Sequence, residues 1–139
     1  MQIGAFLCFK ISGDCLFLEK ITEILKITPR KTYRAGDVCK NKYLEFAYQE
    51  DCWLASYEVP EEQSFEDAVT EFLQPYLLQK ELIVDLAKKH SISLFISLYP
   101  EENQMNICLS KKILEILYEL NVELNMTTLY LSDFYEGKA

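Results

Sequence analysis

The apolar residues of this chain repeat with two different periods, and the alternation between these periods constrains the fold more than any motif. Every second residue between positions 3 and 11 is apolar, as in a β-strand, whereas the apolar residues between positions 17 and 25 lie on one face of a helix. Phe6 and Cys8 make part of the second face of the strand apolar, as expected of a central strand. The sequence therefore predicts a mixed fold.

The same two patterns continue to the end of the chain and predict the element order βαββαββαβ. This order favours an α+β fold, a two-layer sandwich with the helices on one face of a largely antiparallel sheet, with elements arranged in the ferredoxin-like manner. The expected elements are a strand at 3–11, a helix at 17–25, a hairpin of strands 43–48 and 52–59, a helical region at 64–86, a hairpin of strands 92–99 and 105–109, a helix at 110–120 and a strand at 123–131.

Two prolines and a serine mark helix boundaries. Thr28 before Pro29 is expected to end the first helix, because proline disfavours helical geometry in the residue before it. Ser64 is expected to cap the helix that follows it. Pro75 predicts either a kink or a second helix that holds Pro75 in its first turn. Residues 29–42 lack periodicity and are expected to form a long loop.

Length and composition favour one soluble domain spanning residues 1–139, because half of the residues are hydrophobic. The N-terminal residues do not have the pattern of a signal peptide, and no apolar run is long enough to span a membrane, so we expect a cytoplasmic protein. The five cysteines form no C-x-x-C pair and are expected to be reduced thiols.

Charge is divided into two opposed segments. Residues 26–42, the basic segment, hold six basic residues and one acid, for a local charge of +5. Residues 43–79, the acidic segment, hold nine carboxylates and no Lys or Arg, and the whole chain has a net charge of −8. Because the rest of the chain would repel a polyanion, nucleic acid is not expected as a partner. The division instead indicates surfaces that select a charged partner.

The sequence does not favour an enzyme. His90 is the single histidine, which leaves no histidine cluster for a metal site, and its position predicts a cation at a helix C-terminus. The paired carboxylates are adjacent in sequence, which is typical of a solvated surface rather than of an acid and a base across a cleft. The four glycines do not form a phosphate-binding loop. We therefore expect no catalytic residue, metal or cofactor.

Two binding hypotheses remain. The first is a small non-enzymatic binding module, immunity-like or regulatory, that engages a basic protein partner through the acidic segment, with the candidate residues Glu50, Asp51, Glu58, Glu61 and Glu62. The alternative is a sensor or carrier of a small anionic ligand bound by the basic loop at 29–42, with the candidate residues Arg30, Lys31, Arg34 and Lys40. The sequence does not indicate the oligomeric state.

Several short segments of the chain match the sequence pattern of a known family, and they occur in the same order. They are residues 11–14 (Ile-Ser-Gly-Asp), 21–29 (Ile-Thr-Glu-Ile-Leu-Lys-Ile-Thr-Pro), Arg30, Arg34, Gly36, Asp37, Trp53, Leu54, the Pro75 region, 93–98 (Ser-Leu-Phe-Ile-Ser-Leu) and Leu109 with Ser110. In these segments the chain resembles the bacterial family catalogued as domain of unknown function 4279. The resemblance implies a small α+β domain and brings no catalytic residue, because the family has no established activity. It also implies structural roles in the loop: Pro29 stops the helix, Gly36 permits the turn, and Asp37 caps the turn or pairs with Arg34.

Overall fold

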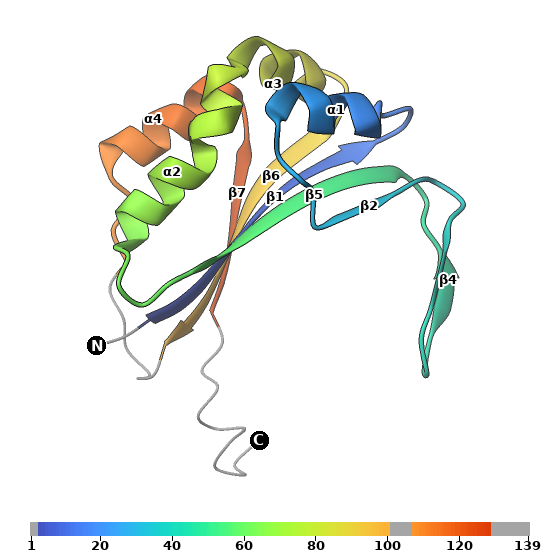
Figure 1. Ribbon diagram of the computed structural model, residues 1–139, viewed down its shortest axis with the longest axis horizontal. Coiled ribbons are helices and arrows are strands. Elements are labelled where there is room, and N and C mark those ends of the chain that lie inside the picture. The colour runs from blue at the N-terminus through green and yellow to red at the C-terminus, as the bar shows by residue number, and fades with distance from the viewer. Residues whose placement is uncertain (1–2, 101–106, 129–139) are drawn as a thin grey trace.

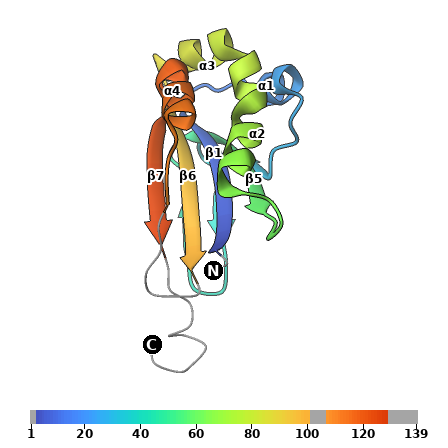
Figure 2. The ribbon, with the colours of Figure 1, turned by 90° about the vertical axis from the view of Figure 1, so that its left-hand side faces the viewer.

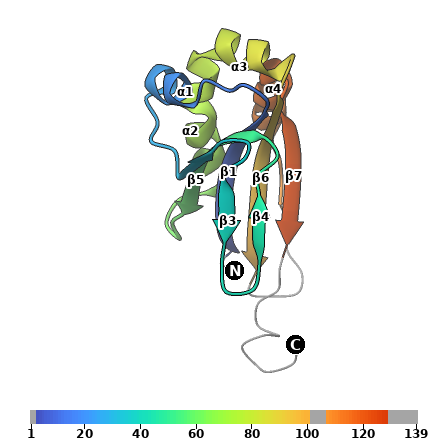
Figure 3. The same ribbon diagram turned by 90° about the vertical axis from the view of Figure 1, so that its right-hand side faces the viewer.

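The computed structural model describes residues 3–100 and 107–128, whose main element is a five-stranded sheet in the order β2-β5-β1-β6-β7. Figures 2 and 3 show this sheet from its two faces. The strands are β1 (Ile3–Gly13), β2 (Lys31–Tyr33), β5 (Asp51–Val59), β6 (Ser91–Pro100) and β7 (Glu123–Thr128). β1 pairs antiparallel with both β5 and β6, which confirms the central position predicted for the first strand.

Four helices in the described part of the chain cover one face of the sheet (Figures 1 and 2). They are α1 (Leu18–Leu25), α2 (Phe65–Leu78), α3 (Lys80–Ala87) and α4 (Lys111–Leu120). The mixed α+β class is thereby confirmed. These helices lack the length and the apolar character that crossing a bilayer requires.

The core lies between the sheet and the helices. On β1 the alternating residues Ala5, Leu7, Phe9 and Ile11 are buried, and they pack with buried residues of the other central strands and of all four helices. Trp53 on β5 is fully buried, and its indole Nε1 donates to Thr22 Oγ1 at 2.9 Å, which ties α1 to the sheet. None of the described helices lies over the opposite face of the sheet, which holds half-buried residues such as Phe6 and Cys8.

The hairpin predicted from 43–48 and 52–59 does not form. Strand β4 (Glu45–Ala47) pairs instead with β3 (Val38–Lys40) in a separate two-stranded sheet. The segment 29–42 is therefore not a plain loop, because it contains β2 and β3. Residues 38–47, which we call the β-arm, project away from the main sheet (Figure 1), so neither face of the β-arm has a core to produce the apolar alternation that would have revealed β3.

The prediction of a strand at 105–109 is also wrong for residues 107–109, the part of this range that the structure describes. Residues 107–109 are irregular, and Ile107 and Leu109 pack against the core instead; Met105 lies outside the described residues. β6 continues through α4 to β7, which pairs parallel with β6. A parallel pair requires a crossover connection, and α4 supplies it. The described order is thus βαββββααβαβ rather than βαββαββαβ.

The helix boundaries follow the predictions only in part. Ser64 caps α2, with its Oγ accepting the Asp67 N–H at 3.2 Å. α1 ends at Leu25, before Pro29 is reached, because Lys26 adopts the left-handed conformation at the C-cap. Pro75 lies inside α2, and α3 begins only at Lys80, so a second helix with Pro75 in its first turn is not found, and a kink at Pro75 stays a prediction.

Candidate functional site

Asp51 anchors the loop that carries the basic residues. Its two carboxylate oxygens accept the backbone N–H groups of Ala35 at 2.8 Å and Leu16 at 2.9 Å, and Nη1 of Arg34 lies 3.7 Å from Oδ2. These two N–H donors, with a smaller contribution from Arg34, hold the pKa of Asp51 below its ordinary value despite burial. Asp51 was predicted to meet a partner, but it is buried and serves the fold.

The turn after β2 has the geometry that the family resemblance implied, with a different ion pair. Asp37 Oδ2 accepts the Arg34 backbone N–H at 2.9 Å, so Asp37 caps the turn. Gly36 has φ +95°, a conformation that favours glycine. The Arg34 guanidinium, however, pairs with Asp51 and not with Asp37. It also donates a hydrogen bond to the Leu16 carbonyl at 3.3 Å.

The four cations proposed for an anion site do not converge. The Arg30 guanidinium lies 5.3 Å from the ring centroid of Phe6, while Lys31 Nζ donates to Tyr48 Oη at 2.9 Å. Arg34 is held by Asp51, and Lys40 lies on the β-arm. A pocket beside Tyr33 is lined by none of these cations but includes Asp14 and Glu50. The geometry therefore gives no support to capture of a small anion in this loop.

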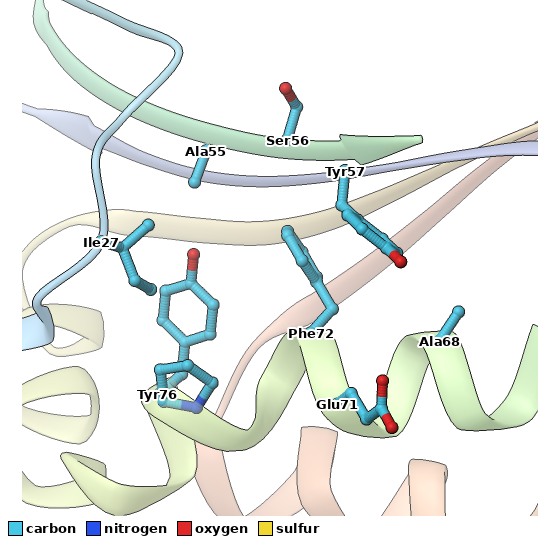
Figure 4. Close-up of a pocket in the computed structure, with 9 residues that line it drawn as sticks. Ile27, Ala55, Ser56, Tyr57, Ala68, Glu71, Phe72 and Tyr76 are labelled. Atoms are coloured by element: carbon cyan, nitrogen blue, oxygen red, sulfur yellow. The ribbon is translucent and has the colours of Figure 1, made fainter. Parts of the chain in front are cut away.

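A different site lies between β5 and α2. A pocket of about 320 Å³ opens there, and Figure 4 shows the side chains that surround it. Its walls are mostly apolar, and two alanines, Ala55 on β5 and Ala68 on α2, leave room for it. It is lined by Ile27, Ala55, Ser56, Tyr57, Ala68, Glu71, Phe72, Pro75 and Tyr76.

Tyr76, one of the residues lining this pocket, holds a buried polar group that is unpaired. The residue is fully buried and its ring stacks on Phe9 with centroids 3.7 Å apart, yet its hydroxyl has no hydrogen-bond partner among the described residues. In Figure 4 the hydroxyl points from α2 toward β5, between Ile27 and Phe72. Burial raises the pKa of Tyr76, so the group stays a neutral hydroxyl. A buried hydroxyl without a partner is uncommon in proteins, and a bound molecule can give it one only where the wall of the pocket moves to expose it.

The outer edge of β5 is open beside the same pocket. β2 pairs with β5 only at Cys52, Trp53 and Leu54. Leu54 directs its carbonyl toward the β2 side, where it accepts the Arg30 N–H at 2.8 Å. Because backbone groups alternate along a strand, the N–H and C=O of Ser56 and Glu58 point to the same outer side. No described strand pairs with β5 there. The Ser56 side chain points away from the pocket (Figure 4), so Ser56 borders it with its backbone.

Acidic residues lie on both elements that border this edge and in the connection between them. Glu58 lies on β5, Glu61 and Glu62 lie in the connection to α2, and Glu71 lines the pocket from α2; we call these four residues the acidic rim. Gln63 links the two elements, accepting from Tyr57 Oη and donating to Glu71 Oε2, both at 2.7 Å. Among the described residues, no ion pair is formed by Glu58, Glu62 or Glu71.

The edge groove, by which we mean the pocket together with the open edge at residues 55–58, was only partly predictable. Three members of the acidic rim, Glu58, Glu61 and Glu62, were among the predicted partner-binding residues, whereas Glu50 lies at the other end of β5. The pocket and Tyr76 were missed. Tyr76 occupies an inward position of a helix, and the sequence does not show that its hydroxyl lacks a partner. The presence of a partner depends on which residues β5 places opposite Tyr76.

Comparison with known proteins gives one match. Residues 2–131 match a protein-family model described as Domain of unknown function (DUF4279). No curated protein and no solved structure matches the chain. The matched range includes every strand and helix described above, so both the edge groove and the β-arm lie within it.

Proposed function

The chain belongs to the DUF4279 family of domains of unknown function, and we propose that it is a non-enzymatic binding module that takes up an extended, basic segment of a partner protein. The segment binds along β5 in the edge groove. The observation that carries this proposal is the open backbone edge at Ser56 and Glu58, which borders an apolar pocket with the buried, unpaired Tyr76 hydroxyl next to it.

Strand addition supplies the affinity in this proposal. An extended peptide that pairs with the outer edge of β5 satisfies the backbone groups of Ser56 and Glu58, as peptides do when they add a strand to an exposed sheet edge. Backbone pairing does not depend on sequence, so it orients the segment without selecting it. Selection falls to the side chains that the edge groove contacts.

Two features of the edge groove select the segment. The pocket favours a side chain with an apolar body and a polar end, because a polar end that reaches the buried Tyr76 hydroxyl gives it the hydrogen-bond partner that it lacks in the free protein. The acidic rim attracts positive charge on either side of that residue and raises the association rate. The partner class is therefore a basic, extended segment of a regulatory or target protein.

Selection from a random library tests this proposal. A displayed library of nine-residue peptides is selected on the full chain, and the enriched peptides are synthesised and titrated at low and high salt. We expect enriched sequences with a net positive charge and one recurring large residue with a polar end, with affinity that falls as salt rises. Enrichment of acidic or charge-free peptides, or affinities that do not depend on salt, would contradict it.

A further inference from the structure

The β-arm is an exposed surface that the other described elements leave largely uncovered. Among the described elements, β3 and β4 pack substantially only on each other. Four of its ten residues are large, exposed hydrophobics: Val38, Tyr43, Leu44 and Phe46. A two-stranded hairpin alone is only marginally stable in water, and an exposed apolar cluster marks a contact surface. Packing beyond that of the described residues would therefore stabilise the β-arm.

Hydrogen bonds and a ring stack hold the base of the β-arm, so the arm has a fixed direction relative to the main sheet. Gly36 N donates to the Tyr48 carbonyl at 2.7 Å, and Tyr48 N donates to the Asp37 carbonyl at 2.9 Å. The rings of Tyr33 and Tyr48 stack with centroids 3.6 Å apart. These contacts fix the direction in which the arm leaves the sheet, and Figure 1 shows it extending away from the helices.

The tip of the β-arm has the chemistry that the edge groove selects. Tyr43 is 87% exposed, and its aromatic ring with a terminal hydroxyl is a side chain with an apolar body and a polar end. Lys42 Nζ lies 5.5 Å from the centroid of that ring, and Lys40 adds a second cation. The acidic rim offers the opposite charge. One chain thus carries both halves of a complementary contact.

The two halves lie too far apart to meet within one chain. The β-arm precedes the first residue of β5, Asp51, whereas the edge groove lies along the later part of that strand, beside α2. Figure 1 places the arm and α2 at opposite ends of the molecule. We propose that a second copy of this chain inserts its β-arm into the edge groove, with Tyr43 in the pocket, and that the exchange is reciprocal.

This inference rests on the edge groove of the proposed function and names one partner for it. A reciprocal exchange uses the same two surfaces on both copies and closes as a two-fold dimer, whereas a one-way exchange would continue into a filament. In the dimer, the Tyr43 ring fills the pocket that Tyr76 helps to line, and Lys40 and Lys42 face the acidic rim. The open edge of β5 gains a strand of the partner's arm, which removes an exposed sheet edge.

Light scattering on size-exclusion fractions of the full chain tests the dimer. We expect the wild type to be a dimer, and two variants to be monomers: an arm variant, Lys42→Glu with Tyr43→Ser, and a groove variant, Ser56→Pro. Tyr118→Ser is the matched control, because Tyr118 on α4 is 86% exposed and lies outside both surfaces. A wild type that is monomeric at every concentration, or an arm variant that stays dimeric, would overturn the proposal.

Mixing the two variants distinguishes a dimer held by arm-to-groove contacts from a dimer held by any other interface. The groove variant retains an intact arm and the arm variant retains an intact groove, so we expect their mixture to form a heterodimer with one working contact. An arm-to-arm dimer could not be restored in this way, so a mixture that stays monomeric would refute the exchange. The monomeric arm variant also keeps the edge groove, so its binding of the selected basic peptides reports on the proposed function independently of the dimer.

Discussion

The carboxylate of Asp51 accepts the backbone N–H of Ala35 at 2.8 Å, across sixteen residues of sequence. Its second oxygen accepts the N–H of Leu16 in the segment before α1. One buried side chain thereby fixes two separate segments at the start of β5. The direction of the β-arm and the position of the loop after β1 both depend on this carboxylate.

Replacing Asp51 with asparagine is expected to lower the free energy of unfolding by about 2–4 kcal/mol, because bonds from two N–H groups to a charged acceptor are lost or weakened. Since folding lowers the pKa of Asp51 below 3.8, its contribution is complete above that pH and is lost as the pH falls through the lowered pKa. Urea unfolding of both proteins between pH 7 and about pH 3 measures this. A difference between them that does not shrink at acid pH would contradict the assignment.

Gly13→Ala is expected to lower the free energy of unfolding by about 1–3 kcal/mol. Gly13 has φ +152°, and an added Cβ would lie 2.5 Å from Cδ2 of His90. The His90 ring cannot easily move, because its nitrogens lie 3.2 Å from the Leu86 carbonyl oxygen and 2.9 Å from that of Asp14. Thermal unfolding of Gly13→Ala, His90→Ala and the double variant measures the effect. Additive losses in the double variant would show that the two side chains do not collide.

The parts of the fold that bury one face were predictable from the sequence, and the parts that bury none were not. β1 alternates because Leu7 and Phe9 face the helices while Cys8 faces the other side. Ser64 was recognised as a cap because its bond to Asp67 is local. A strand at the position of β4 was predicted, but β3 and the pairing of β4 with it were not, because the apolar residues of the β-arm face solvent and no core imposes a period on them.

Tertiary contacts explain the remaining differences. The parallel pairing of β7 with β6 depends on where α4 places the chain, and nothing in the alternation of a short strand reports its direction. The edge groove likewise depends on β2 ending its pairing at Leu54, which leaves the rest of β5 open. Asp51 resembles its acidic neighbours in sequence, and only the folded loop shows that it is buried.

Tyr76→Phe is expected to raise the free energy of unfolding of the isolated protein by about 1 kcal/mol, because it removes a buried hydroxyl that has no partner. The same change is expected to shift the peptide preference toward a purely apolar residue at the pocket. Urea unfolding and a repeated library selection measure the two effects. A loss of stability of 1 kcal/mol or more would show that the hydroxyl is already satisfied, which would remove this source of selectivity.

Neutralising the acidic rim is expected to weaken the binding of basic peptides about tenfold at low salt and to flatten the salt dependence. The variant combines Glu58→Gln, Glu62→Gln and Glu71→Gln, three exposed side chains. Its control makes the same change in net charge at Glu19, Glu81 and Glu115, which are exposed on α1, α3 and α4. Equal effects in both variants would mean that overall charge, and not the rim, attracts the peptide.

The central claim is that β5 binds an extended segment through the backbone at Ser56, and calorimetric titration of one selected basic peptide tests it most directly. Ser56→Pro removes the outward N–H, while Ser56→Ala keeps it, and neither change removes a ladder bond to β1. We expect Ser56→Ala to bind as the wild type does and Ser56→Pro to bind at least about tenfold more weakly, with both variants folded by circular dichroism. Binding by folded Ser56→Pro with wild-type affinity would contradict the account.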